Sequence, residues 1–316
     1  VTAASETMSP ATLPSETRFA FMVNAAAGTG LAPRRLAGLL GRHPVLLGRS
    51  RLVMTGSLDG LDRALDDLAP DEVPVAVGGD GSLNALLVRV LARDATRPVG
   101  TIPFGTGNAV AAALGLRSPD AAMRALAAGA VRPLDVMRTD HPRAPLALVS
   151  CSAGFEAAFL QRYGAVRYRN RQWAGWSALL GNLPRRWRDV QVSCDGTPLV
   201  STGEPVHNAG CYVVPTYAFG KVMWPGLTTT DGLGIAAAAR DVGAYWTLMA
   251  RGAALPPAAD TVTRLGVRTR RFTSAIVASD SGVQIDGEAL GPATVRLEVV
   301  PSAVRVVSVA DSAPTD

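Results

Sequence analysis

The sequence predicts a fold of two parts: an α/β domain with a parallel sheet, followed by an antiparallel, β-sandwich-like domain. In the first half of the 316 residues, short apolar runs alternate with segments of helical periodicity, which is typical of a parallel sheet. In the second half, short β-like runs follow one another between turn signals such as Asp195-Gly196 and Asp286-Gly287, which favours an antiparallel arrangement. The pattern changes between residues 135 and 147.

The elements of the first half follow from buried runs and from helix signals. Strands are predicted at 19–23, 51–54, 73–77 and 99–102, and helices at 33–41, 59–68, 82–93 and 107–114. Ser118 and Pro119 supply a helix N-cap and first residue, and Gly129 ends that helix. A strand near 133–137 leads out of the domain.

The second half contains only short runs of β-forming residues. Strands are predicted at 146–150, 189–194, 210–215, 233–238, 263–268, 274–278, 283–286, 294–299 and 304–309. We therefore expect a disordered tail at 1–17, an α/β domain at 18–135 and a β-rich domain at 136–310. The last strands are candidates to pack back on the first domain.

Three predicted strands of the first half end in loops rich in Gly, Thr or Asn. The most informative loop is Gly78-Gly79-Asp80-Gly81-Ser82, between a buried run and a helix; the others lie at 103–108 and 24–30. Glycines at such junctions let backbone N–H groups approach a phosphate, and a helix N-terminus favours negative charge. An aspartate inside such a loop indicates a role with a metal ion or a proton. The carboxyl ends of parallel strands share one edge, so these loops predict a nucleotide site there.

Five elements in this order resemble the diacylglycerol kinase catalytic domain family, which includes bacterial diacylglycerol kinases, sphingosine kinases and ceramide kinases. They are the loop at 78–82, Pro103-Phe104-Gly105-Thr106-Gly107-Asn108, Ala153-Gly154-Phe155-Glu156-Ala157, Thr230-Asp231-Gly232-Leu233 and Val283-Gln284-Ile285-Asp286-Gly287-Glu288. The resemblance extends from Phe19 to Val307. It implies a plan of two domains, with an ATP-binding domain at 18–135 and a lipid-substrate domain at 136–310. It also implies an ATP-dependent lipid kinase that uses Mg²⁺.

The resemblance assigns roles to individual residues. The residues expected to bind the nucleotide are Asn24, Thr55, Gly78, Gly79, Asp80, Gly81, Ser82, Asn84, Gly105, Thr106 and Asn108. Asp80 is also expected to take part in catalysis, either in activating the acceptor or by reaching Mg²⁺ through water. Glu288 is the expected general base, and Asp286 assists it. Asp231 is the candidate ligand of a structural Mg²⁺.

Several positions depart from the family pattern. Asn84 and Asn108 are followed by Ala85 and Ala109 where the family has acids, and Thr230 stands where many members have a second acid. Fewer carboxylates weaken a site for a hard cation. Glu156 replaces an aspartate and so keeps the charge but changes the reach. The sequence therefore leaves open a catalytically impaired homologue that binds nucleotide or lipid.

Composition and the remaining motifs bear on partners. The net charge of +5 suits anionic partners, the three cysteines lack metal-ligand spacing, and no nucleic-acid-binding motif occurs. Trp173, Trp176, Leu180 and Leu183 form an apolar face within the arginine-rich stretch 161–189, which is typical of a helix at a membrane surface. We expect a cytoplasmic, peripherally membrane-associated enzyme with a diacylglycerol-like or sphingoid-like acceptor and no nucleic acid. A homodimer, an NAD kinase-like activity and a sugar or polyketide-type acceptor stay open.

Overall fold

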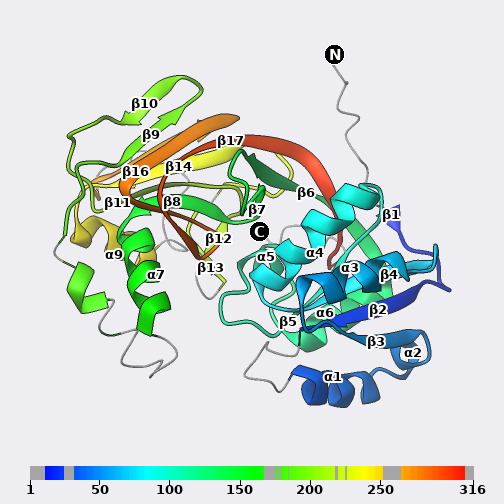
Figure 1. The fold of residues 1–316 in the computed structure, drawn as a ribbon. Helices are drawn as coiled ribbons and strands as arrows, with labels where there is room; N and C mark the ends of the chain where they lie inside the picture. The colour runs from blue at the N-terminus through cyan, green and yellow to red at the C-terminus, as the bar shows by residue number, and fades with distance from the viewer. Residues whose placement is uncertain are drawn as a thin grey trace. The chain divides into compact units, whose positions relative to one another are not determined.

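The chain divides into two compact units, which are described separately (Figure 1). The computed structural model describes residues 11–24, 32–166, 176, 179–183, 185–217, 220–224, 226–251 and 265–309. Unit 1 comprises the chain up to Asp135, the segment Thr216–Lys221 and the chain from Pro301 onward; unit 2 comprises Val136–Pro215 and Val222–Val300.

Unit 1 contains a sheet of four parallel strands. They are β2 (Arg18–Val23), β3 (Ser50–Met54), β4 (Glu72–Gly78) and β5 (Gly100–Pro103). Their order is β3-β2-β4-β5, and all neighbouring pairs are parallel. Every residue of β4 and β5 is buried. A central strand covered on both faces reads as a continuous apolar run, and this is why the strands could be located from the sequence.

Helices follow each of these strands. They are α1 (Ala32–Gly41), α2 (Pro44–Leu47), α3 (Leu58–Asp66), α4 (Asp80–Arg93), α5 (Ala109–Ala113) and α6 (Pro119–Ala128). Figure 1 shows α3 and α4 on one face of the sheet and α1 on the other. Ser57 and Ser118 cap α3 and α6 by accepting backbone N–H groups. Gly129 ends α6 with a φ of +70°, as the sequence predicts.

The start and the end of the chain both contribute to unit 1. Residues 11 and 12 form a short strand β1 (Ala11–Thr12), which pairs with the start of β6 (Ala130–Thr139). Thr17 is also buried. The expectation of a disordered tail reaching residue 17 was therefore wrong for residues 11–17, because the backbone of this segment bonds to the edge strand and to the end of α6. Near the other end of the chain, Val306 forms a parallel bridge with Val99.

Unit 2 is built on antiparallel strands, which confirms the predicted fold class. The strands with residues in this unit are β6, β7 (Leu146–Ala147), β8 (Ser150–Gly154), β9 (Gln191–Cys194), β10 (Thr197–Val200), β11 (Asn208–Tyr212), β13 (Lys221–Val222), β14 (Gly234–Ala239), β15 (Val267–Phe272), β16 (Ser274–Ile285) and β17 (Glu288–Val307). Six of them follow the order β17-β16-β8-β11-β14-β15, and β9 pairs with both β10 and β16. The core lies on the buried faces of these strands, at residues such as Val192, Val277 and Val295.

Some elements of the second half differ from the expected ranges. The predicted strands at 274–278 and 283–286 belong to one strand, β16. Its pairing with β17 changes register between Ser279 and Val283, which gives the sequence the pattern of two strands. The runs at 294–299 and 304–309 likewise fall within or next to a single strand, β17. The helices α7 (Phe155–Val166) and α9 (Val242–Arg251) connect strands of this unit along the chain: α7 follows β8, and α9 follows β14.

The stretch expected to lie at a membrane surface is described only in part. Trp173 lies outside the described residues, whereas residues 176 and 179–182 are helical. Trp176 and Leu180 are 63% and 65% exposed. Among the helices that the structure describes, none is long and apolar enough to span a bilayer.

Candidate nucleotide site and acidic hairpin

The strand order of unit 1 creates a switch point at its central pair. From β2 the chain goes first to β3 on one side and then to β4 on the other. Connections therefore leave the carboxyl ends of β2 and β4 in opposite directions, and the resulting crevice is where open α/β sheets bind ligands. Asn24 follows β2, and Gly79 follows β4.

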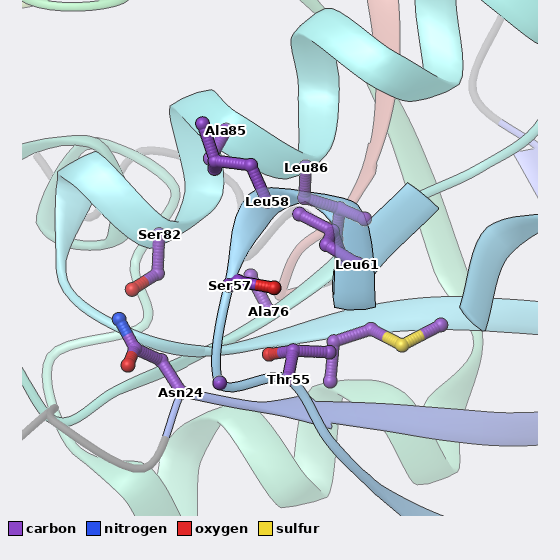
Figure 2. A pocket seen from close by; sticks show the side chains of 11 residues that line it. Asn24, Thr55, Ser57, Leu58, Leu61, Ala76, Ser82, Ala85 and Leu86 are labelled. Carbon is purple, nitrogen blue, oxygen red and sulfur yellow. The ribbon is translucent and has the colours of Figure 1, made fainter. Parts of the chain in front are cut away.

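A pocket of about 200 Å³ lies at this edge of the sheet. Asn24, Thr55 and Ser82, each expected to contact a nucleotide, line it together. Figure 2 shows the Ser82 hydroxyl and the Asn24 amide facing one another. Thr55 is 8% exposed, so its hydroxyl is held within the fold. The structure thus brings together three predicted residues that follow three different strands, β2, β3 and β4.

The other wall of this pocket is apolar and was not anticipated. It is formed by Met22, Leu58, Leu61, Ala76, Ala85 and Leu86. Polar groups at one end and aliphatic side chains at the other suit a ligand that has an anionic and a flat apolar part. Ala85 contributes a methyl group to this wall. Ser57 also lines the pocket, and its N-cap position after Thr55-Gly56 is a signal that could have indicated it.

The two glycine loops of unit 1 touch through their backbones. The Gly78 carbonyl accepts the N–H groups of Phe104, at 2.8 Å, and Gly105, at 3.1 Å. A Cβ added to Gly105 would lie 2.4 Å from Gly79 Cα, which is closer than carbon atoms can approach. Only glycine fits at residue 105, because any side chain would clash with Gly79. The two loops therefore form one continuous backbone surface.

We expect Gly105→Ala to force the loops apart. Overpacking of this kind costs about 1–3 kcal/mol of folding free energy, so the melting temperature should fall, and the affinity for ATP should fall by about tenfold or more. Thermal unfolding and calorimetric titration with ATP measure both. The control for stability is Gly81→Ala, because a Cβ there meets no atom within 4 Å. An unchanged melting temperature and ATP affinity in Gly105→Ala would contradict the contact.

Asp80 links the first glycine loop to the helix after the second. Its Oδ2 accepts the N–H of Ala109 and its Oδ1 accepts the N–H of Val110, each at 3.0 Å. The carboxylate therefore caps α5 from the first turn of α4. Burial raises the pKa of Asp80, although the amide donors on its oxygens act in the opposite direction. The sequence did not reveal this contact, since the partners lie 29 and 30 residues apart.

Other predicted residues of the two loops have different surroundings. Asn108 has a left-handed backbone, with φ of +49°, and its side-chain amide bonds both the N–H and the carbonyl of Gly105. Its side chain thus braces the second loop. Thr106 is exposed and Asn84 is half-buried on α4, and neither lines the pocket.

The segment Thr216–Lys221 also holds α5. It includes β12 (Thr216–Tyr217), which pairs with β13. The buried Thr216 hydroxyl donates to the Ala109 carbonyl at 2.6 Å. Ala109 is therefore fixed through its N–H by Asp80 and through its carbonyl by Thr216.

A basic hollow of about 560 Å³ borders the second loop of unit 1. Arg34, Arg35 and Arg42 line it together with Phe104 and Gly105. Asp120 pairs with Arg42 at 3.2 Å, which leaves an excess of positive charge in the lining. Such a surface raises the local concentration of anionic ligands near the loops.

In unit 2, the predicted acidic element is a tight hairpin. Asp286 and Gly287 have φ values of +49° and +88°, and Ile285 pairs with Glu288 across the turn, as expected for an Asp-Gly turn of type I′. The Asp286 carboxylate accepts the N–H groups of residues 148, 149 and 150 at 2.7 to 3.0 Å. Asp286 is thus an anchor of the turn, whereas Glu288 is exposed at its end.

Asp231, the candidate metal ligand, contacts an arginine. Arg271 Nη1 lies 3.0 Å from its Oδ2, and the Leu233 N–H donates to its Oδ1. Where the structure describes the chain, no group of three or more His, Cys, Asp or Glu side chains could hold a metal ion. A guanidinium at this distance opposes the binding of a cation, so the expected metal site at Asp231 has an ion pair in its place.

Comparison with known proteins agrees with this architecture. Residues 18–139 match the family model of the diacylglycerol kinase catalytic domain. A candidate diacylglycerol kinase from Bacillus anthracis str. Sterne has a TM-score of 0.70 at 15% identity, over 92% of this chain and 97% of that one. A further structure, described as a diacylglycerol kinase from the same organism, has a TM-score of 0.65 at 14% identity with the same coverage. These likenesses show the fold.

Two further comparisons give weaker or no similarity. An NAD kinase from Archaeoglobus fulgidus in complex with ATP has a TM-score of only 0.43 at 14% identity, over 92% of this chain and 93% of that one, and no argument rests on it. A search of the curated proteins finds no match to this chain.

The parallel α/β unit with joined glycine loops, followed along the chain by an antiparallel unit, is the architecture that this chain shares with these solved structures. Residues 18–139 match the model of the diacylglycerol kinase catalytic domain, a kinase family, and the resemblance predicted from the sequence is confirmed. The family is one of phosphotransferases that use ATP.

Proposed function

We propose that this protein transfers the γ-phosphoryl group of ATP directly to the hydroxyl of a lipid, without a phosphoenzyme. The observation that carries the proposal is the pocket at the switch point of unit 1, where Asn24, Thr55 and Ser82 meet. Phosphoryl transfer needs alignment and charge neutralisation more than covalent chemistry from the protein, and backbone loops with amide and hydroxyl side chains supply such alignment.

ATP suits the residues at this edge of the sheet. The pocket is smaller than most ligand sites, which measure roughly 300–1,000 Å³, so it takes part of the nucleotide while the remainder lies outside. We propose that the phosphates lie along Gly79–Ser82 and Gly105–Thr106. Mg²⁺ would neutralise phosphate charge, and Asp80 would reach it only through water, because both Asp80 oxygens already accept backbone N–H groups.

Glu288 is proposed as the group that accepts the proton of the attacking hydroxyl. The hairpin supports this role because Asp286 fastens it to residues 148–150 and leaves the Glu288 carboxylate exposed. A base held on a rigid turn keeps its position as the substrate arrives. Asp286 would assist by holding the turn.

The acceptor is proposed to be a diacylglycerol-like or sphingoid-like lipid, reached from a membrane surface by a cytoplasmic enzyme. The exposed Trp176 and Leu180 support a surface of this kind, because tryptophan and aliphatic side chains favour the interfacial region of a bilayer. Arg185 and Arg186, also exposed, would meet acidic headgroups.

The test of the function is an acceptor screen with radiolabelled ATP and Mg²⁺. Diacylglycerol, monoacylglycerol, a sphingoid base and a ceramide are presented in mixed micelles, and NAD in solution. We expect label in at least one lipid and none in NAD. Label in NAD alone would support an NAD kinase-like enzyme, and label in no acceptor, with ATP still bound, would support a binding protein without catalysis.

We expect the double variant Trp176→Ser/Leu180→Ser to lose about tenfold or more in binding to anionic vesicles, because each large side chain withdrawn from water contributes up to about 1.5–3 kcal/mol. Cosedimentation with vesicles measures the loss. The control is Leu47→Ser, since Leu47 is comparably exposed, at 51%, on helix α2. Equal binding by the double variant and the wild type would refute this surface.

A further inference from the structure

A buried carboxylate lies in the interior of unit 2. Glu156, in the first turn of α7, is 5% exposed. Its Oε1 accepts the hydroxyls of Tyr212, at 3.2 Å, and Tyr245, at 3.0 Å. Its Oε2 accepts the Ser152 hydroxyl at 2.5 Å and Gln284 Nε2 at 3.4 Å. A carboxylate that has lost its water is retained only where donors replace that water, and here both oxygens have them.

This arrangement fixes the orientation of the Gln284 amide. Gln284 is fully buried, and its Nε2 also donates to Ser152 Oγ, at 2.7 Å, and Ser150 Oγ, at 3.1 Å. A carboxylate oxygen can only accept, so the NH₂ end of the amide must face Glu156. The carbonyl end then faces the opposite way, where Oε1 accepts the N–H of Gly287 at 2.8 Å.

Gly287 is the second residue of the turn that presents Glu288. One anchor of this turn is the Asp286 carboxylate on residues 148–150. The bond from Gly287 to Gln284 is a second anchor, and its polarity depends on Glu156. The chain of contacts from Glu156 through Gln284 to Gly287 lies entirely within unit 2.

We propose that Glu156 is a positioning residue: by setting the orientation of the Gln284 amide, it holds the Gly287 N–H and so the place of Glu288. This deepens the proposed function, and it rests on that function in assigning Glu288 to the acceptor hydroxyl. The Glu156 side chain is long enough to meet Tyr245 with one oxygen and Gln284 with the other.

Variants of Glu156 and Gln284 test this chain of contacts from Glu156 through Gln284 to Gly287, which we call the relay. In Glu156→Gln, the two tyrosine hydroxyls hold the new carbonyl, so the new NH₂ faces Gln284. Two NH₂ groups then face one another, which favours the opposite orientation of the Gln284 amide, and in that orientation its NH₂ meets the N–H of Gly287 and the anchor at Gly287 is weakened. We expect kcat to fall by about ten- to a hundredfold, with the KM for ATP within about twofold, because the nucleotide loops belong to unit 1.

The reciprocal variant Glu156→Gln/Gln284→Glu should recover. The glutamine at 156 would donate to the carboxylate at 284, and the second oxygen of that carboxylate would accept the N–H of Gly287. We expect kcat within about threefold of the wild type, whereas Gln284→Glu alone, with two adjoining carboxylates, is impaired. A positive coupling in this double-mutant cycle is the signature of direct contact.

Two readouts separate positioning from a general loss of stability. Amide hydrogen exchange at Gly287, followed by NMR without substrate, should quicken by tenfold or more in each single variant and return to the wild-type rate in the double variant. The affinity for ATP, measured by calorimetric titration, should stay within about twofold of the wild type in Glu156→Gln, because the nucleotide loops belong to unit 1 and remain folded. The control is Tyr245→Phe, which removes one donor from Oε1 and should leave both readouts unchanged.

These experiments distinguish a failure of the positioning role of Glu156 from a failure of the proposed kinase function. Wild-type exchange at Gly287 in Glu156→Gln, or a double variant no better than the singles, overturns the relay. Altered exchange with unchanged kcat overturns the positioning role. If the wild-type protein phosphorylates no lipid, the proposed function fails, but the exchange rates at Gly287 still decide whether Glu156 controls the turn.

Discussion

Asp80→Asn is expected to lower the rate of phosphoryl transfer by roughly a hundredfold or more. The carboxylate accepts one backbone N–H on each oxygen, from Ala109 and Val110. An asparagine offers one acceptor and one NH₂ group, so one of these N–H groups meets a donor. The start of α5 then shifts, and with it the second loop. The unmade bond should also lower the free energy of unfolding by about 1–3 kcal/mol.

Steady-state kinetics and thermal unfolding measure both effects of Asp80→Asn. Asp195→Asn is the matched control, because the Asp195 carboxylate likewise accepts backbone N–H groups, those of Thr273 and Ser274, in unit 2. It should lower stability and leave turnover within about twofold. Near-normal turnover in Asp80→Asn would show that neither the cap on α5 nor contact with Mg²⁺ matters to the reaction.

Glu288→Gln is expected to lower kcat by about 10²–10⁴-fold, the usual contribution of a general base, while the affinity for ATP stays within about twofold. The side chain is exposed, so the melting temperature should not change. Rapid-quench measurement of labelled product gives kcat, and calorimetric titration gives the ATP affinity.

Glu298→Gln is the control for Glu288→Gln. Glu298 is on the same strand, β17, and its side chain is 63% exposed beside Arg138. Its loss should leave kcat unchanged. A Glu288→Gln enzyme that turns over as fast as this control would remove Glu288 from the reaction.

The parallel sheet could be predicted closely because its strands are buried on both faces. Residues 73–77 form an unbroken apolar run that stops at Gly78-Gly79, and the observed strand β4 differs by one residue at each end. The helix start at Ser118 could be predicted equally well, since this serine caps its helix through its own side chain. Local signals of this kind do not depend on the rest of the fold.

The strands and helices of the antiparallel unit were harder to predict from the sequence because its strands are irregular. The bulge between Ser279 and Val283 interrupts the alternation of β16, so one strand resembled two. Helix α9 was not predicted, although Asp241 caps it by accepting the N–H of Ala244.

For the candidate site, the residue types could be predicted but their contacts could not. The motifs indicated Asp80, Gly105 and Asn108, yet the cap on α5 and the closeness of Gly105 to Gly79 are contacts between distant parts of the chain. The network around Glu156 depends likewise on Tyr212 and Tyr245, 56 and 89 residues further along the chain. Their tyrosine hydroxyls carry no local signal in the sequence.

The claim that the joined glycine loops of unit 1 form the ATP site is tested most directly by photolabelling. The protein is irradiated with 8-azido-ATP and Mg²⁺, and the labelled peptides are identified by mass spectrometry. We predict saturable labelling of peptides that contain Thr55–Leu61 or Ser82–Leu86, which line the pocket, and its loss when excess ATP competes. Saturable labelling confined to peptides outside these segments would contradict the account.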